Sequence, residues 1–306
     1  MLTKFKFIFL FFFSIFSLNS YATESINILW AFNIGSNQAN TIRLIIDEAN
    51  KSQNKYEFRI DGKPGAGGTT AANFVNENPN NTVVGMSSSF FIRPAFEGGK
   101  NPVHNLDTYR PILVQSEGSP LVFVSNKFTS FKDAVKQPNL TIGVSGIGSI
   151  SHLAANELVK KNSTATVVNF KNMIDASTAA GGGHVDIAVG FYADLKPLLD
   201  ANRLNIIGYT GKKVLPGLTD LRLSNFGISN ADNLTANYAV FASKGMDQKK
   251  FEEISAILSK ANKNKLVLDS YAIEFLQPLS LNIAESMQWY SNERKYWTDQ
   301  VQFILK

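Results

Sequence analysis

The chain has 306 residues, of which 44% are hydrophobic and 18% charged, and this profile excludes an intrinsically disordered protein. The absence of cysteine excludes disulfide scaffolds, zinc–thiolate sites, iron–sulfur clusters and thiol nucleophiles. A formal charge of +5 is too small and too dispersed to indicate nucleic-acid binding. The three histidines, His104, His152 and His184, do not stand at metal-ligand spacing, so we expect neither a metal nor another cofactor.

The N-terminus has the features of a secretory signal peptide. Lys4 and Lys6 precede an apolar run over residues 7–13, and residues 20–22 (Ser-Tyr-Ala) have the small-x-small form of a signal-peptidase site. The run is about half the roughly 20 residues that a membrane-spanning helix needs, although an uncleaved anchor is the alternative. We therefore predict that residues 1–22 are removed and that the mature protein is periplasmic.

Beyond residue 22, strand and helix patterns alternate, which predicts an α/β fold with ligand-binding loops at the carboxyl ends of the strands. At this length one large or two medium domains are expected. Strands are predicted over residues 26–30, 56–60, 83–86, 112–114, 121–124, 141–144, 167–168, 185–189, 205–209 and 238–242. Helices are predicted over residues 42–49, 69–75, from about 151, 173–180 and 283–301.

Three loops place Ser, Thr, Gly or Asn directly before a predicted helix, at residues 149–151, 67–70 and 36–40. The first turn of a helix carries unpaired N–H groups and a partial positive charge, so it receives anions well. Plain helix capping would give the same residue types. Three such loops in one chain nevertheless favour carboxylate binding.

Other loops only partly match catalytic or nucleotide-binding motifs. Residues 62–67 have the glycine spacing of a phosphate-binding loop, but Gly68 stands where the motif needs Lys. Residues 146–148 lack the third glycine of a dinucleotide fingerprint. Ser151 and His152 are adjacent, which leaves a periplasmic serine hydrolase as an alternative, but adjacency is not triad geometry. We expect His152 to cap a helix or face the core.

An ordered set of segments resembles the extracytoplasmic solute receptors of tripartite tricarboxylate transporters, the Bug family. The segments are GKPGAGG (62–68), TVVGMSS (82–88), YRPI (109–112), PLVFV (120–124), GVSGIGSISHL (143–153) and GGHVD (182–186). The resemblance implies a two-lobed, Venus-flytrap α/β receptor in which each lobe is a mostly parallel sheet flanked by helices. It further implies a monomer that closes on a small di- or tricarboxylate or related organic acid and delivers it to a two-component membrane permease.

The resemblance also implies the domain boundaries and the site. Residues 23–122 and 241–306 would form one lobe and residues 123–240 the other, with residues 238–242 crossing the hinge. A receptor that signals to a membrane sensor is the alternative to transport. The ligand-binding residues implied by the matching positions are Asn33, Gly35, Ser36, Asn37, Ser87, Ser88, Ser89, Ser145, Gly148, Ser149, Ser151 and Lys171, the last within an aromatic-Lys pair with Phe170.

The first loop departs from the family pattern. The family has an Asp shortly before the first helix, and Ala39 stands at that position, with the amides Asn37, Gln38 and Asn40 around it. Amides offer both donors and acceptors, so the pocket could suit a ligand other than a plain dicarboxylate. Arg93 lies just beyond the Ser87–Ser89 loop and could pair with a carboxylate, but we expect its side chain to be exposed.

Overall fold

The computed structural model describes residues 23–97 and 104–305, so the predicted signal peptide lies outside the described residues. Within those two ranges no helix combines the length and the apolar character needed to cross a membrane.

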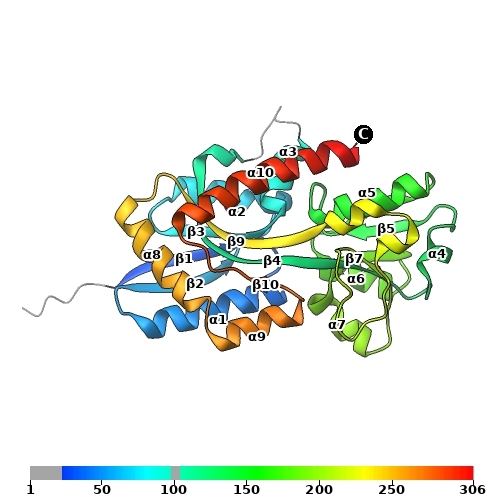
Figure 1. Cartoon of the computed structure of the whole chain (residues 1–306), viewed down its shortest axis with the longest axis horizontal. Helices are drawn as coiled ribbons and strands as arrows, with labels where there is room; N and C mark the ends of the chain where they lie inside the picture. The colour runs from blue at the N-terminus through cyan, green and yellow to red at the C-terminus, as the bar shows by residue number, and fades with distance from the viewer. Residues whose placement is uncertain (1–22, 98–103, 306) are drawn as a thin grey trace, which may run out of the picture.

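Strands and helices alternate along most of the chain (Figure 1). The strands are β1 (Glu24–Trp30), β2 (Tyr56–Gly62), β3 (Thr82–Ser87), β4 (Tyr109–Ser125), β5 (Thr141–Val144), β6 (Thr166–Asn169), β7 (Ile187–Phe191), β8 (Asn205–Tyr209), β9 (Thr235–Ser243) and β10 (Gln277–Pro278). The α-helices are α1 (Asn37–Ser52), α2 (Thr69–Glu77), α3 (Ser89–Phe96), α4 (Phe131–Ala134), α5 (Ile150–Lys161), α6 (Met173–Gly181), α7 (Tyr192–Asp200), α8 (Gln248–Ala261), α9 (Lys265–Ile273) and α10 (Ile283–Leu305). Short 3₁₀ turns are η1 (Ala66–Gly68), η2 (Leu106–Thr108), η3 (Leu223–Phe226) and η4 (Ser229–Asn233).

The strands are arranged as two lobes that share β4 and β9. The order of strands is β2-β1-β3-β9-β4-β7-β5-β6, with β8 and β10 also pairing with β4. Pairing is parallel within β2-β1-β3 and within β7-β5-β6, and antiparallel wherever β4 or β9 takes part. Figure 1 shows β4 and β9 running side by side between the two lobes. The first lobe holds β1 to β3, and the second holds β5 to β8.

The strands predicted at residues 112–114 and 121–124 are one continuous strand, β4. Its first part pairs with β9, from Tyr109 opposite Ser243 onward, and its last part pairs with β7 and β8. Between these parts the register with β9 shifts, and Gly118 adopts a φ of 85°, which an L side chain rarely tolerates. The polar and glycine residues that read as a break are therefore an irregular stretch within one strand.

Helix α1 shows how an amphipathic pattern fixes an element of the first lobe. Ile42, Ile45, Ile46 and Ala49 are buried at helical spacing, and the helix packs against β2, α8 and α9. The Ser36 side chain caps the helix by accepting a hydrogen bond from the Ala39 N–H. This cap fixes the start of the helix directly after the loop that follows β1.

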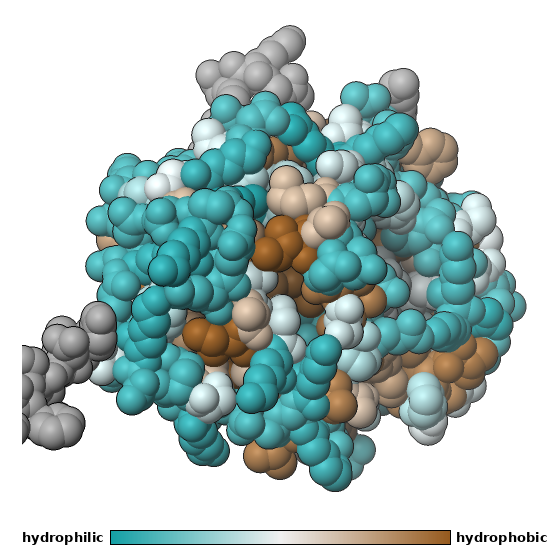
Figure 2. Space-filling model, turned by 60° about the vertical axis from the view of Figure 1, so that its left-hand side comes forward, coloured by the Kyte–Doolittle hydropathy of each residue, from teal (hydrophilic) through white to brown (hydrophobic). Residues whose placement is uncertain are grey.

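In the other lobe a second apolar cluster covers one face of the sheet, while the opposite face belongs to the main cluster that also fills the first lobe. Val122 and Val124 at the end of β4 are buried against Ala176 and Ala180 of α6 and Leu195 of α7. Outside these cores, the face shown in Figure 2 is mostly hydrophilic, with apolar side chains gathered in a few small patches. The two cores hold the strand ends of both lobes in place around the space between them.

Candidate functional site

The loops that follow five parallel strands meet at a cavity of about 50 Å³ between the lobes. Its polar lining comes from Asn33, Ser36 and Gln38 after β1, Ser87 and Ser89 at β3, Ser145 after β5, Asn172 after β6 and Asp194 after β7. Ligands of open α/β sheets bind beyond the carboxyl ends of the strands, which is where this cavity lies. Trp30, Phe32, Phe191 and Tyr238 supply its aromatic walls.

Five helices begin at this cavity. Ser36, Asn172 and Phe191 are the N-cap residues of α1, α6 and α7, while Ser89 and Ile150 are the first residues of α3 and α5, and all five line the cavity. Each N-terminus carries a partial positive charge. Among the residues that the structure describes, the lining contains no Lys, Arg or His. The electrostatic attraction for an anion therefore comes from helix ends and hydroxyls.

Three serines form a hydroxyl cluster in the second lobe. Ser151 Oγ accepts a hydrogen bond from the Ser145 N–H at 3.1 Å and lies 3.0 Å from Ser145 Oγ and 2.9 Å from Ser149 Oγ. Ser149 is the N-cap of α5, since its hydroxyl accepts a bond from the His152 N–H. Ser149 and Ser151 thus fold the loop, and Ser145 is the member of the cluster that lines the cavity.

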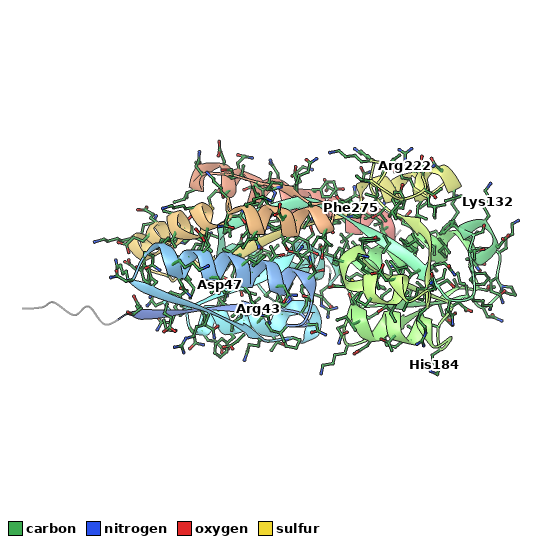
Figure 3. All side chains as sticks on the ribbon, turned by 90° about the horizontal axis from the view of Figure 1, so that it is seen from below. Arg43, Asp47, Lys132, His184, Arg222 and Phe275 are labelled. Carbon is green, nitrogen blue, oxygen red and sulfur yellow. The ribbon has the colours of Figure 1, made fainter. Side chains whose placement is uncertain are left out.

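The lobes touch one another on several sides of the cavity. The Asn37 N–H donates to Asp194 Oδ1 at 2.8 Å, and the Ile150 N–H donates to Ser89 Oγ at 3.4 Å. Phe275, at the end of α9, packs its ring 5.3 Å from that of Tyr192 in α7. Figure 3 shows Phe275 at the junction of the two lobes. The structure is therefore a closed form.

Two carboxyl groups meet at the first turn of α1. Asp194 is partly exposed, whereas Glu274 is 1% exposed and accepts hydrogen bonds from Asn37 Nδ2 (3.2 Å), Gln38 Nε2 (2.9 Å) and Ser119 Oγ (3.4 Å). Burial, followed by the charge of Asp194, raises the pKa of Glu274 to about 8. Burial also raises the pKa of Asp194, against the lowering effect of the Asn37 N–H.

The structure divides the twelve predicted site residues into groups. Asn33, Ser36, Ser87, Ser89 and Ser145 line the cavity. Gly35 and Asn37 line an adjoining groove of about 400 Å³ that also contains Asp194, and Lys171 lines another of about 290 Å³. Ser88, Gly148, Ser149 and Ser151 lie behind the lining: the Ser88 hydroxyl, for example, accepts a bond from the Asn237 N–H. Ligand contact by any of the twelve stays a prediction.

The expectation of an exposed Arg93 was wrong. Its side chain is 16% exposed, pairs with Glu97 at 2.6 Å and donates from Nη1 to the Ile147 carbonyl oxygen at 2.7 Å. A Cβ added at Gly148 would lie 2.8 Å from Arg93 Cδ, so the arginine packs directly on that glycine. Sequence spacing placed Arg93 near the Ser87–Ser89 loop but gave no sign of this contact with the opposite lobe.

His152 is held in a structural role. Its Nδ1 atom accepts a hydrogen bond from the Gly148 N–H at 3.1 Å, and its ring packs edge-on against Phe96. Burial lowers the pKa of His152 to about 4. The lone pair that a general base for Ser151 would use is therefore already engaged elsewhere. Within the described ranges, no three His, Cys, Asp or Glu side chains are grouped so as to hold a metal ion.

The sequence reasoning missed three residues of the cavity lining: Asn172 after β6, Asp194 after β7 and Tyr238 in β9. Asn172 caps α6 by accepting a bond from the Asp175 N–H, and the Asn-x-x-Asp spacing was a signal that could have located it. Asp194 lies in the first turn of α7, a helix that was not predicted. Tyr238 was expected as part of a hinge strand, and its ring also forms part of the cavity wall.

Solved structures of bacterial receptors have the same fold. BugD, a periplasmic binding protein, is 17% identical and superposes with a TM-score of 0.82 over 93% of this chain and 98% of its own. An R. palustris protein solved with adipate is 20% identical (TM-score 0.78, 93% and 98%). MatC from Rhodopseudomonas palustris, solved with bound malate, is 19% identical (TM-score 0.77, 91% and 99%). The two-lobed periplasmic-binding-protein fold is therefore confirmed.

The sequence also matches a family model over most of its length. The model is that of the tripartite tricarboxylate transporter family receptor, and it matches residues 41–304. The matched range includes the loop over residues 145–151, the shared strands β4 and β9, and nearly all of the C-terminal helix α10. Members of this family are binding proteins, which agrees with the engaged lone pair of His152 and removes the hydrolase alternative. The chain belongs to the tripartite tricarboxylate transporter receptor family.

Proposed function

We propose that this protein captures a small organic acid between its two lobes and delivers it to a two-component membrane permease. The observation that carries the proposal is the convergence of five helix N-termini on one cavity between the lobes. A carboxylate there would accept bonds from hydroxyls such as Ser89 and Ser145 and from backbone N–H groups. Such charge-assisted bonds each contribute about 1.5–3 kcal/mol. Adipate and malate in the two R. palustris relatives support this ligand class.

Capture requires the lobes to separate. A cavity of about 50 Å³ has room for a few water molecules, so a dicarboxylate enters only when the Asn37–Asp194 and Ser89–Ile150 contacts open. The proposed lobes are residues 23–122 with 241–306, and residues 123–240, and they would rotate about β4 and β9. Closure with ligand inside would create the surface that the permease recognises.

Delivery to a permease places the mature protein on the outer side of the cytoplasmic membrane. The charged and apolar pattern of residues 1–22 supports export, with a mature N-terminus at Thr23. Intact-mass analysis of the periplasmic fraction is expected to show the loss of these residues. Recovery of the full-length chain in the membrane fraction would contradict export.

The ligand class is tested by thermal unfolding of the mature protein with malate, adipate, succinate and citrate. A ligand bound by the native state alone stabilises it by about 2.7 kcal/mol at a hundred times its Kd, so at least one acid is expected to raise the melting temperature. The matched control is the diamide of the same acid, which has similar shape and no charge. If neither these acids nor amino-bearing acids such as L-aspartate raise the melting temperature, or if the diamide does so equally, carboxylate capture is refuted.

A further inference from the structure

One side of the cavity is rich in hydrogen-bond acceptors. Asp194 reaches it from the first turn of α7, and one of its oxygens, Oδ1, accepts the Asn37 N–H. Glu274 lies behind the same turn of α1 and takes bonds from the Asn37 and Gln38 side chains. The first turn of α1 therefore has two carboxyl groups beside it.

These carboxyl groups have no cation to balance them. None of the ion pairs in the part of the chain that the structure describes involves Asp194 or Glu274. Burying a carboxylate without a counter-charge is costly, and two adjacent carboxylates increase the cost. The same cost raises the pKa of Glu274, because burial and the neighbouring Asp194 favour its protonated, uncharged form. Glu274 therefore keeps its proton near neutral pH, and Asp194, which lines the cavity, is the carboxylate that a cation from outside would balance.

The wall beside Asp194 also contains polar atoms without a partner. Gln38 is 3% exposed and lines the cavity; its Nε2 donates to Glu274 at 2.9 Å, while its Oε1 is buried with no hydrogen-bond partner among the described residues. The Tyr238 hydroxyl, also in the lining, is buried without a partner as well. A buried acceptor that stays unpaired costs about 1–3 kcal/mol, so a ligand in the cavity gains by donating a hydrogen bond to Gln38 Oε1.

Together these groups match an ammonium ion and not a second carboxylate. An ammonium group has three N–H donors and no acceptor, and Asp194, Gln38 and Tyr238 offer acceptor oxygens from residues that line the same cavity. A second ligand carboxylate would instead lie against the Asp194 carboxylate. Ser89 of the first lobe and Ser145 of the second lobe supply hydroxyl donors for the carboxylate, and Ser89 lies at another inter-lobe contact, its bond with Ile150.

We infer that the ligand carries a protonated amino group besides its carboxylate, and that Asp194 and Gln38 bind this ammonium. The inference rests on the proposed function and narrows its ligand class to amino acids and similar amino-bearing acids. Asp194 has two tasks in this arrangement. Its Oδ1 joins the lobes through Asn37, and its second oxygen pairs with the ligand.

The test compares acids that differ only in the amino group. Calorimetric titration is carried out with L-aspartate against succinate, L-glutamate against glutarate, and L-alanine against propionate. At least one amino acid is expected to bind ten times or more tightly than its partner. If an acid without the amino group binds and none of the amino acids binds better, the ammonium site is refuted while carboxylate capture stands. If no member of any pair binds, both proposals fail.

A variant assigns the effect to Asp194. Asp194→Asn keeps the shape of the side chain and an oxygen for the Asn37 N–H, but removes the charge. The variant is expected to bind the amino acid at least tenfold more weakly, and to bind the partner acid without the amino group equally well or more tightly. The matched control is Asp200→Asn at the other end of α7, where the carboxylate pairs with Lys196 on the surface. Equal weakening of both acids in Asp194→Asn would overturn the assignment, and the wild-type comparison decides the ligand class even if this variant does not fold.

Discussion

The Arg93 guanidinium of the first lobe donates a hydrogen bond of 2.7 Å to the Ile147 carbonyl oxygen of the second. Glu97, the residue directly after α3, forms an ion pair with the same guanidinium at 2.6 Å. The bond joins the lobes beside the loop over residues 145–151. Arg93 and Ile147 line the adjoining groove that contains Lys171, and neither lines the cavity. Arg93 therefore stabilises the closed form without being part of the cavity lining.

The Arg93→Met variant is expected to populate the open form more and to bind its ligand about three- to tenfold more weakly. Hydrogen bonds to charged groups contribute about 1.5–3 kcal/mol, and partial exposure reduces the contribution of this one to about 1 kcal/mol. X-ray scattering without ligand should give a larger radius of gyration than for the wild type. The control is Arg43→Met on α1 (Figure 3), whose guanidinium donates to the Ile34 carbonyl oxygen at 2.8 Å within one lobe. A radius of gyration equal to the wild type in Arg93→Met would show that the bond does not hold the lobes.

Gly148 has no room for a side chain because of the same arginine. Its φ is +77°, and a Cβ would lie 2.8 Å from Arg93 Cδ and 3.0 Å from Nη1. Gly146, with a φ of +124°, has nothing within 4 Å of the corresponding position. Both alanine variants carry backbone strain, but Gly148→Ala is expected to weaken ligand binding several-fold more than Gly146→Ala. In an Arg93→Ala background, which removes both Cδ and Nη1, calorimetric titration should show that this difference shrinks. An undiminished difference would mean that Gly148 acts independently of the arginine.

Ser145 and Ser149 are expected to respond differently to alanine. Ser145 lines the cavity, so Ser145→Ala should weaken carboxylate binding by roughly tenfold, since about 1.4 kcal/mol corresponds to one decade. Ser149 caps α5, so Ser149→Ala should lower the free energy of unfolding by about 1 kcal/mol with a smaller effect on affinity. Calorimetry and urea unfolding of both variants separate the two roles. The reverse pattern would place the ligand against Ser149, as the sequence alone led us to expect.

Glu274 is expected to make the protein less stable as the pH rises. Its pKa is about 8 in the folded protein against 4.5 ordinarily, so between these values the folded state retains a proton that the unfolded state has released. By linkage, the free energy of unfolding then falls as pH rises, by at most about 1.4 kcal/mol per pH unit. Glu274→Gln resembles the protonated form and should remove this slope.

The measurement is urea unfolding at pH 6.8 and pH 8.5, with wild type and variant compared at each pH. Lower pH values are avoided because burial lowers the pKa of His104 and of His152 to about 4, and both groups destabilise the folded state below about pH 6.5. Asp47→Asn, at an exposed position on α1 (Figure 3), is the control and should keep the wild-type slope. A slope in Glu274→Gln equal to that of the wild type would show that Glu274 does not titrate in this range.

Local patterns in the sequence were enough to predict strands β1 to β9, five of the helices (α1, α2, α5, α6 and α10) and the loops after β1, β3 and β5, but not α3, α4 or α7. Strand alternation and N-cap residues are local signals, which is why Thr141–Val144 and Asn205–Tyr209 were predicted with the bounds that the structure shows. Contacts between the lobes have no local signal. Arg93 against Ile147 and Asn37 against Asp194 join residues 54 and 157 positions apart, so they follow from the packing of whole lobes. The same limit hid the continuity of β4, because its glycine and polar residues resemble a loop until β9 is placed beside them.

Strand β9 also determines when the first lobe can be completed. It occupies the sheet position between β3 and β4, which do not pair with each other in the strand order. A chain that emerges N-terminus first therefore has an open edge on β3 until Ser243 appears, and helices α8 to α10, which cover the lobe, follow later still. The N-terminal third therefore cannot complete its own sheet before β9 has been made. If the chain is exported as we propose, a first lobe that is finished last would leave time for translocation before folding.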